Sequence, residues 1–243
     1  MVRLFASDID GCLSEPFVPF VLDDFAELRR LTRLPGAPAF TLCTGRPLGY
    51  AEATAQALDV RLPFLFEAGA GMYDLTTGRR AWHPDFGPEQ ERAIAAIQEH
   101  LESVVRGTDM SVDRGKHTQA GVIGADTDDI LRARDQIQAY VTDHHAEFVV
   151  AHTPISVDIM HRALTKREGL LWLGRELGID IADMAFIGDT GGDKGALELV
   201  GTSFAPANAT GPVKRAVHHV LPGTASKAVL AAYQACIASS SSP

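Results

Sequence analysis

The feature that most constrains the fold is a short apolar segment near the N-terminus that ends in two closely spaced acids. Leu4–Ala6 forms the apolar run, Asp8 and Asp10 follow it, and Gly11 stands directly behind them. The run is typical of a buried strand, and Gly11 marks where that strand must end. In an open α/β sheet, ligands bind at the carboxyl ends of the strands. Two acids at that position repel each other unless a cation or a shared proton relieves them.

The size and charge of the chain exclude several classes of protein. It has 243 residues, of which 46% are hydrophobic, and a chain of this length buries roughly 70–75% of its unfolded surface. One large domain, or one domain with a smaller insertion, is expected. The net charge of −9 argues against a general nucleic-acid-binding protein, which needs a basic face. No apolar run approaches the ~18 residues that span a membrane, and we expect no signal peptide because the N-terminus enters a strand almost at once.

The cysteines are few and odd in number. Cys12, Cys43 and Cys236 do not form a disulfide framework, so we expect a reducing compartment and a cytoplasmic location. Cys12 and Cys43 would both lie near strand ends of one sheet. A regulatory disulfide between them is therefore an alternative, which requires Cα atoms within ~7 Å of each other.

Strand-length and helix-length segments alternate at both ends of the chain. Strands are predicted at 4–6, 39–43, 64–66, 184–187 and 203–205, and helices at 23–34, 49–58, 168–177, 194–200, 213–220 and 225–237. This alternation is typical of a parallel sheet with crossover helices. It predicts an α/β fold with a Rossmann-like parallel-sheet core, in which the strand at 64–66 is the third strand.

The middle of the chain has a different order of elements. Its helices are predicted at 88–105 and 127–144, and each is followed by a pair of short strands, within 109–124 and 148–160. This order is typical of an α+β module. We therefore predict an inserted α+β domain at 82–161, with residues 1–81 and 162–243 forming the core.

Polar residues stand beside four segments of the predicted core. They are Asp8 with Asp10, Thr44 with Gly45, Lys166, and Asp189 with Asp193. Each alone has an ordinary explanation: a turn after a strand, a helix cap, a solvated lysine or a glycine-rich loop. Their occurrence together, in this order and each beside a strand of one sheet, is hard to obtain from turns alone and indicates one site.

These residue types suit phosphoryl transfer. A carboxylate can act as the nucleophile and accept a phosphoryl group, but it must be ionised, which needs a cation nearby. The acids that would converge are Asp8, Asp10, Asp189 and Asp193. Mg²⁺ is the natural occupant of such a site because it prefers oxygen ligands and keeps substrate phosphate in its shell.

The remaining residues supply positioning and proton transfer, which phosphoryl transfer also requires. The Thr44 hydroxyl and the Gly45 amide can hold phosphate oxygens, and Lys166 can balance the charge of phosphate and nucleophile. The leaving oxygen needs a proton, and Asp10, two residues after Asp8, can deliver it.

These segments resemble the four motifs of the haloacid dehalogenase superfamily of phosphatases. The matching stretches are Ser7–Gly11, Cys43–Pro47, Lys166 and Gly188–Asp193. The insertion lies where that superfamily's class-two caps lie, and its order of elements is similar to the sugar-phosphatase and phosphoglycolate-phosphatase branch. The resemblance covers nearly the whole chain.

The resemblance implies a role for each matching residue. Asp8 would be the nucleophile, Asp10 the general acid/base and Lys166 the charge partner, while Asp189 and Asp193 would hold the metal together with the Asp8 carboxylate and the Asp10 carbonyl. Substrate binding would fall to Thr44, Gly45, Arg46 and Asn208. Four residues depart from the family pattern without removing a core catalytic group: Cys12, Ala68, Arg167 and Gly192.

We therefore expect a Mg²⁺-dependent phosphatase that acts on a small phosphorylated metabolite, of the sugar phosphate or phosphoglycolate type, through an aspartyl phosphate. One alternative is a phosphomutase on the same fold, for which Arg114, Lys116 and His117 are candidate ligands of a second phosphate. Another is a phospho-accepting signalling domain of the receiver type, although such domains are much shorter. We expect neither nucleic acid nor membrane as a partner, and the sequence predicts no oligomeric state.

Overall fold

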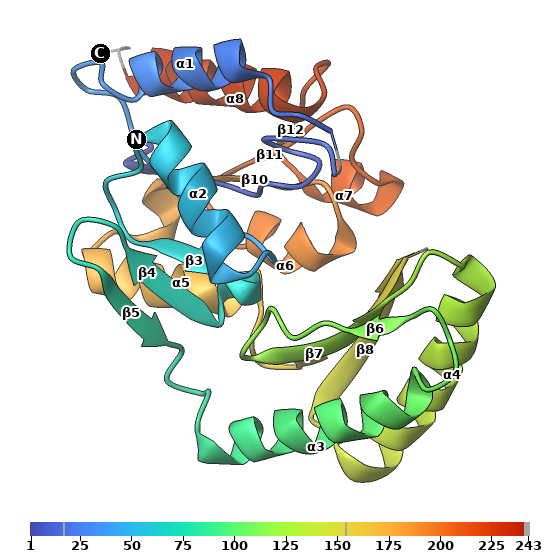
Figure 1. Ribbon diagram of the computed structural model, residues 1–243. Helices are drawn as coiled ribbons and strands as arrows, with labels where there is room; N and C mark the ends of the chain where they lie inside the picture. The colour runs from blue at the N-terminus through green and yellow to red at the C-terminus, as the bar shows by residue number, and fades with distance from the viewer. Residues whose placement is uncertain (17, 154, 241–243) are drawn as a thin grey trace. The chain divides into compact units, whose positions relative to one another are not determined.

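The computed structural model describes residues 1–16, 18–153 and 155–240, without the side chain of residue 240 (Figure 1). The chain divides into two compact units, Met1–His83 with Thr165–Pro243, and Pro84–Leu164. The first contains a parallel sheet with helices on both faces, and the second an antiparallel sheet with two helices. The α/β fold class expected from the sequence is confirmed.

The first unit is built on a five-stranded sheet in the order β12-β11-β10-β1-β2, in which every pairing is parallel. Its strands are β1 (Leu4–Ser7), β2 (Ala39–Leu42), β10 (Met184–Ile187), β11 (Thr202–Ala205) and β12 (His219–Val220). From β1 the chain first adds β2 on one side and later adds β10, β11 and β12 on the other. The direction of winding therefore reverses between β1 and β10, and the carboxyl ends of these two strands border the crevice where such folds bind ligands.

Helices cover both faces of this sheet. Along β1, Phe5 packs with one group of helices, whereas Leu4 and Ala6 pack with the other, because successive side chains of a strand point to opposite faces. One face carries α1 (Leu22–Leu31), α2 (Leu48–Leu58) and α8 (Ala225–Ser240), and the other carries α5 (Lys166–Leu177), α6 (Lys194–Leu197) and α7 (Gly211–Ala216). The strands β1, β2, β10 and β11 are almost entirely buried, whereas the edge strand β12 is exposed.

One predicted strand belongs to a different sheet. β3 (Phe64–Phe66) was expected to continue the parallel sheet, but it pairs antiparallel with β4 (Gly71–Asp74), which pairs with β5 (Arg79–Trp82). Only an isolated bridge between Cys43 and Leu65 continues the parallel direction. The chain reverses through a single 3₁₀ turn, η1 (Glu67–Gly69), and the Phe66 ring lies where a side chain on Gly71 would stand. β4 therefore lies beside β3 directly after the turn.

The C-terminal part of the first unit also differs in detail. The helix predicted at 213–220 ends at Ala216, and His219–Val220 pairs with β11 as an edge strand. Short 3₁₀ turns, η2 (Ile181–Asp183) and η3 (Gly191–Asp193), flank β10. The second of these turns ends on an acid of the predicted site.

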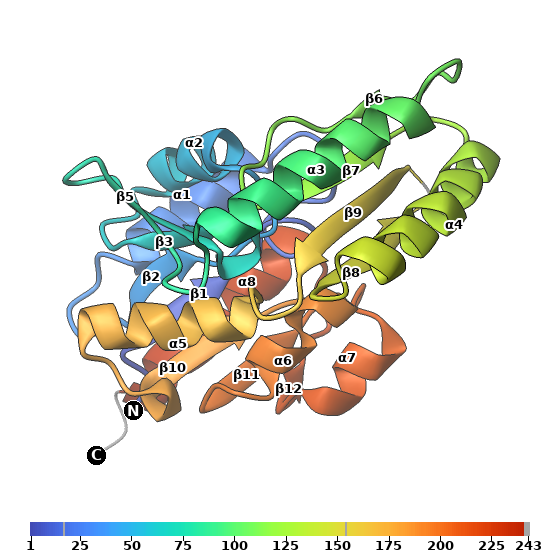
Figure 2. The same cartoon turned by 90° about the horizontal axis from the view of Figure 1, so that it is seen from below.

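The second unit has a four-stranded antiparallel sheet in the order β6-β7-β9-β8. Its elements are α3 (Pro88–Val104), β6 (Ser111–Val112), β7 (Gln119–Ile123), α4 (Thr127–His144), β8 (Phe148–Thr153) and β9 (Ser156–His161). Both helices pack on one face of the sheet (Figure 2). Ile97, Leu101 and Ile137 are fully buried in the core that they share with it. Asp126 begins α4 by accepting hydrogen bonds from the next turn.

Two further observations bear on the sequence expectations. Within the described ranges, no helix is both long enough and apolar enough to cross a bilayer. Cys12, Cys43 and Cys236 are buried, and none of the three is part of a disulfide bond.

Candidate active site

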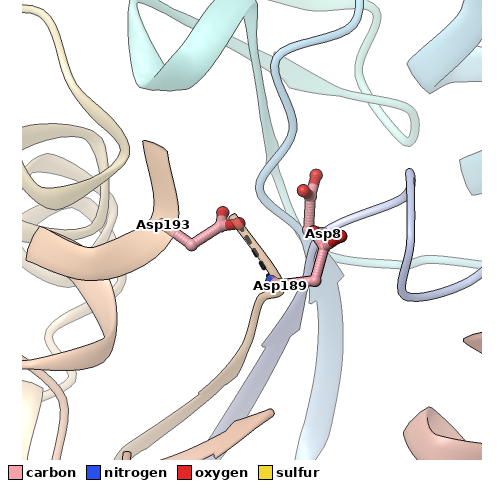
Figure 3. A group of neighbouring side chains, drawn as sticks. All are labelled: Asp8, Asp189 and Asp193. Atoms are coloured by element: carbon pink, nitrogen blue, oxygen red, sulfur yellow. Dashed lines mark hydrogen bonds between the residues drawn. The ribbon is translucent and has the colours of Figure 1, made fainter. Parts of the chain in front are cut away.

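Three carboxylates meet at the carboxyl ends of β1 and β10. Ser7 is in register with Ile187, so Asp8 and Asp189 leave neighbouring strands at the same edge, and Asp193 ends the η3 turn that follows. One oxygen from each of these three side chains lies within 4.8 Å of the other two (Figure 3). The order of strands therefore brings Asp8 beside two acids that lie more than 180 residues later in the chain.

Lys166 joins two of these acids. Its Nζ atom lies 2.8 Å from Asp8 Oδ2 and 2.6 Å from Asp193 Oδ1, and the residue is only 6% exposed. Thr165 accepts a hydrogen bond from the Glu168 amide and so begins α5 at Lys166. Burial alone would lower the pKa of Lys166, but the charges of Asp193 and Asp8 outweigh it and raise that pKa well above its usual value. The lysine is therefore a fixed positive charge.

Despite the positive charge of Lys166, the pKa values of two of these acids are raised. Burial raises the pKa of Asp8 to about 6, although Lys166 opposes the shift. Burial, followed by the charges of Asp193 and Asp8, raises the pKa of Asp189 to about 7. Three carboxylates against a single ammonium leave two negative charges when all are ionised, which is the charge that a divalent cation would balance.

The oxygen atoms of Asp189 and Asp193 are used differently. Asp193 Oδ2 accepts hydrogen bonds from the amides of Asp189 and Thr190 and from the Thr190 hydroxyl, while Oδ1 accepts from Lys166. Asp189 Oδ1, in contrast, is buried and has no hydrogen-bond partner among the residues that the structure describes. A buried carboxylate oxygen is normally satisfied, and a set of hard oxygen donors with excess negative charge suits a divalent cation such as Mg²⁺. The residues present thus fit a metal.

Asp10 lies outside this cluster and is paired with Arg46. Arg46 donates from Nε to Asp10 Oδ2 and from Nη2 to Oδ1, each over 2.6 Å. The guanidinium also lies 4.5 Å from the centre of the Tyr50 ring. The sequence placed Asp10 and Arg46 in one site, but nothing in it indicated that they contact each other.

Thr44 is fixed at the end of β2. It is fully buried, its hydroxyl accepts from the Arg46 amide, its own amide donates to Leu65, and its carbonyl accepts from Ala68. A Cβ atom added to the neighbouring Gly45 would meet no other atom within 4 Å. The backbone at Gly45 therefore borders open space, as a phosphate-binding amide must.

Two glycines, which the sequence pattern indicates only as turn residues, let the acids approach so closely. Gly11 has φ +71°, and a Cβ atom there would overlap Asp189 Oδ2. A Cβ atom on Gly188 would lie 2.5 Å from the Cβ of Asp193. The signal was present as a glycine directly beside an acid in each motif. Asn208, predicted to bind substrate, donates from Nδ2 to the Gly11 carbonyl over 2.8 Å.

The three residues considered as ligands of a second phosphate each lie beside an acid of the second unit. Arg114 pairs with Glu102, and Lys116 Nζ lies 3.2 Å from Asp158 Oδ1. His117 Nε2 lies 3.3 Å from Glu91 Oε1. This pairing gives the phosphomutase alternative no support.

Comparison with known proteins gives a consistent result. A family model described as haloacid dehalogenase-like hydrolase matches residues 76–232. The chain is 23% identical over 234 residues to a phosphoglycolate phosphatase of Methanococcoides burtonii, covering 96% of each. It is 28% identical over 225 residues to a phosphoglycolate phosphatase of Methanopyrus kandleri, covering 91% of each.

The fold of this chain is similar over nearly its full length to those of solved structures. A protein of Thermoplasma acidophilum superimposes with a TM-score of 0.79 at 20% identity, over 97% of this chain and 98% of that one. A sugar phosphatase of HAD subclass IIB superimposes with a TM-score of 0.70 at 16% identity, over 96% and 98%. Both likenesses concern the fold.

Proposed function

This chain belongs to the haloacid dehalogenase-like hydrolases, and we propose that it is a Mg²⁺-dependent phosphatase of a short phosphorylated metabolite, with 2-phosphoglycolate as the first candidate. It is a phosphatase of that superfamily, a hydrolase of phosphoric monoesters. The choice of candidate is supported by the relatives named phosphoglycolate phosphatase, which match nearly the full length of this chain. Sugar phosphates are the other class within the proposal.

The observation that carries the proposal is the contact of one buried ammonium with two acids beside a third. Lys166 holds Asp8 and Asp193, and Asp189 presents an unpartnered oxygen next to them. Asp8 accepts from the Ile9 amide through Oδ1 and from Lys166 through Oδ2. These donors orient the carboxylate and favour its ionised form, which is the form that attacks, against the burial that raises its pKa.

The proposed reaction has two steps. An Asp8 oxygen attacks phosphorus, the bond from phosphorus to the substrate oxygen breaks, and Asp10 gives its proton to the leaving oxygen. Asp10 then takes a proton from water, the water oxygen attacks the aspartyl phosphate, and inorganic phosphate leaves with Asp8 restored. Asp10 must leave Arg46 before it carries a proton, because both of its oxygens accept from Arg46.

The proposed phosphate contacts are the Thr44 hydroxyl, the Gly45 amide and Lys166. The Asp8 and Asp189 carboxylates and the Asp10 carbonyl would hold Mg²⁺, with Asp193 in support. When bound, Mg²⁺ would neutralise charge on the acids and on the substrate phosphate. Arg46 would contact the remainder of the substrate.

The test is a panel of phosphorylated metabolites with Mg²⁺, read by release of inorganic phosphate. We expect 2-phosphoglycolate to be turned over with the highest kcat/KM and Asp8→Asn to abolish turnover. Asp59→Asn changes an acid that pairs with Arg33 and Arg61 and should leave turnover unchanged. Isomerised sugar phosphate without free phosphate would reject the proposal in favour of a mutase, and full activity of Asp8→Asn would remove Asp8 as the nucleophile.

A further inference from the structure

The loop that follows β11 contacts both loops that carry the acids. This loop, Pro206–Thr210, reaches the β1 side through Asn208, whose Nδ2 donates to the Gly11 carbonyl over 2.8 Å. It reaches the β10 side through the Thr210 amide, which donates to the Asp189 carbonyl over 2.9 Å. One segment thus holds the two backbones between which the acids meet.

The loop is itself held firmly. The Ala207 amide donates to the Gly223 carbonyl over 2.8 Å, and Lys214 Nζ donates to the Ala207 carbonyl over 2.6 Å. Asn208 therefore extends from a fixed backbone, and its hydrogen bond transmits that position to Gly11.

Gly11 is the point at which this contact affects the acids. Its amide donates to the Ser14 carbonyl over 2.7 Å, and its carbonyl accepts from Asn208, so both of its backbone groups are fixed. The Asp189 carboxylate occupies the space where a side chain of Gly11 would stand. A shift of Gly11 would therefore change the room available to the Asp189 oxygens, one of which has no partner among the described residues.

We infer that Asn208 is a positioning residue of the metal site: it holds Gly11 so that the Asp189 carboxylate faces Asp8 and Asp193. The inference rests on the metal site of the proposed function. It differs from the substrate-binding role expected from the sequence, because a positioning role changes metal affinity before any substrate is present. Asn208 is exposed apart from this contact, so its replacement removes little packing.

The first experiment is calorimetric titration of Mg²⁺ into the metal-free protein without substrate. We expect Asn208→Leu, which keeps the branched shape but has no donor, to weaken Mg²⁺ binding about 10-fold, as loss of an outer-shell partner does. Asn208→Gln, which keeps the amide, should recover part of that loss. The matched control is Ser226→Ala, which removes a similarly long-range contact, from Ser226 Oγ to Asp24 Oδ2, away from the acids. It should lower the unfolding temperature and leave Mg²⁺ affinity unchanged.

A second readout uses the composition of the chain. Asn208 is the only asparagine among the 243 residues, so labelling with ¹⁵N-asparagine gives one side-chain amide pair in an NMR spectrum. We expect that pair to shift when Mg²⁺ binds and to exchange slowly with solvent because it donates to Gly11.

Each contrary result is distinct. Unchanged Mg²⁺ affinity in Asn208→Leu with a raised KM assigns Asn208 to the substrate and overturns the inference. If Ser226→Ala weakens Mg²⁺ binding as much as Asn208→Leu does, the effect reflects general stability and the inference is overturned. A wild-type chain that binds no Mg²⁺ also overturns the inference. If Mg²⁺ affinity depends on Asn208 but the chain releases no phosphate from any substrate, the proposed function is rejected and the inference stands.

Discussion

Arg46 binds Asp10 through two parallel hydrogen bonds, Nε to Oδ2 and Nη2 to Oδ1, and lies against the face of Tyr50. Both members are about one-third exposed, at 31% and 30% of their side chains. The pair separates Asp10 from the cluster of Asp8, Asp189 and Asp193 and balances its charge locally. In the arrangement described, the acid proposed to move protons is thus held apart from the acid proposed to attack.

The strength of this pair can be measured without reference to activity. A double-mutant cycle of Arg46→Met and Asp10→Asn in urea unfolding should give a coupling free energy of about 1 kcal/mol, because the geometry is bidentate but the pair is partly exposed. Arg46→Lys should retain less than half of that coupling, since one ammonium cannot form both bonds. A coupling near zero would mean that solvent screens the contact completely.

The second prediction concerns Asp189 in the metal-free protein. Its pKa is raised to about 7, whereas an unfolded aspartate titrates near 3.9. Between these values the folded chain binds a proton that the unfolded chain has released, so stability falls as pH rises from about 4 to about 7 and is then constant. Asp8, with a pKa raised to about 6, acts in the same direction. Asp189→Asn should therefore be more stable than the wild type at about pH 8 without metal.

Mg²⁺ should make the wild type more stable than Asp189→Asn at about pH 8, because the ion binds the ionised acids. The unfolding temperature of the wild type should rise with Mg²⁺ more at about pH 8 than at about pH 5, and that of Asp189→Asn should barely change. Asp193→Asn is the contrasting control: Asp193 accepts four hydrogen bonds, so its loss should destabilise the metal-free chain at both pH values. Equal destabilisation by the two substitutions would contradict the difference between Asp193, whose oxygens accept hydrogen bonds, and Asp189, which has an oxygen without a partner among the described residues.

The third prediction concerns backbone strain in the η1 turn. Ala68 has φ 57° and ψ 31°, a left-handed conformation that costs an L-residue with a side chain roughly 1–2 kcal/mol. Ala68→Gly removes this cost but adds about 0.5–1 kcal/mol of chain entropy, so the free energy of unfolding should increase by up to about 1.5 kcal/mol. Ala70→Gly, at φ −76°, has no strain to relieve and should be destabilising. Urea unfolding compares them, and similar losses in both would show that Ala68 is unstrained.

The fourth prediction concerns the assignment of residues 82–161 as a separate domain, which stays a prediction. Ile137 is fully buried in a hydrophobic cluster made only of residues of the second unit. Ile137→Ala should cost about 2–5 kcal/mol and accelerate amide hydrogen exchange in α3, α4 and the sheet beneath them, but not in β1. The reciprocal control is Leu28→Ala, on α1 of the first unit. Faster exchange in both units from either substitution would indicate one cooperative body.

Much of the site could be read from residue order. Asp8, Asp10, Asp189 and Asp193 were predicted to converge, because parallel strands present their carboxyl ends at one edge. The structure brings together Asp8, Asp189 and Asp193, whereas the Asp10 side chain pairs with Arg46. Lys166 was predicted beside a strand of the same sheet, and the structure places it at the first residue of α5. These expectations depended on the position of each polar residue relative to the strand or helix beside it, and the folded chain keeps those positions.

The errors have a common physical origin. Phe64–Phe66 has the composition of a buried strand in any sheet, and its partner was decided by the tight turn at η1 and the absence of a side chain on Gly71. The contact of Arg46 with Asp10 and that of Asn208 with Gly11 depend on side-chain conformations and on distances near 2.6–2.8 Å. Residue types and spacing carry no information at that scale.

The sequence by itself determined which chemical groups gather at the end of the sheet, because strand periodicity and the order of strands dictate where each polar residue leaves the backbone. The tertiary structure decided how those groups are shared: Lys166 between Asp8 and Asp193, Arg46 with Asp10, and an oxygen of Asp189 without a partner among the described residues. That division arises because hydrogen bonds and charge pairs act over a few ångströms and at specific angles, which only the packed chain sets.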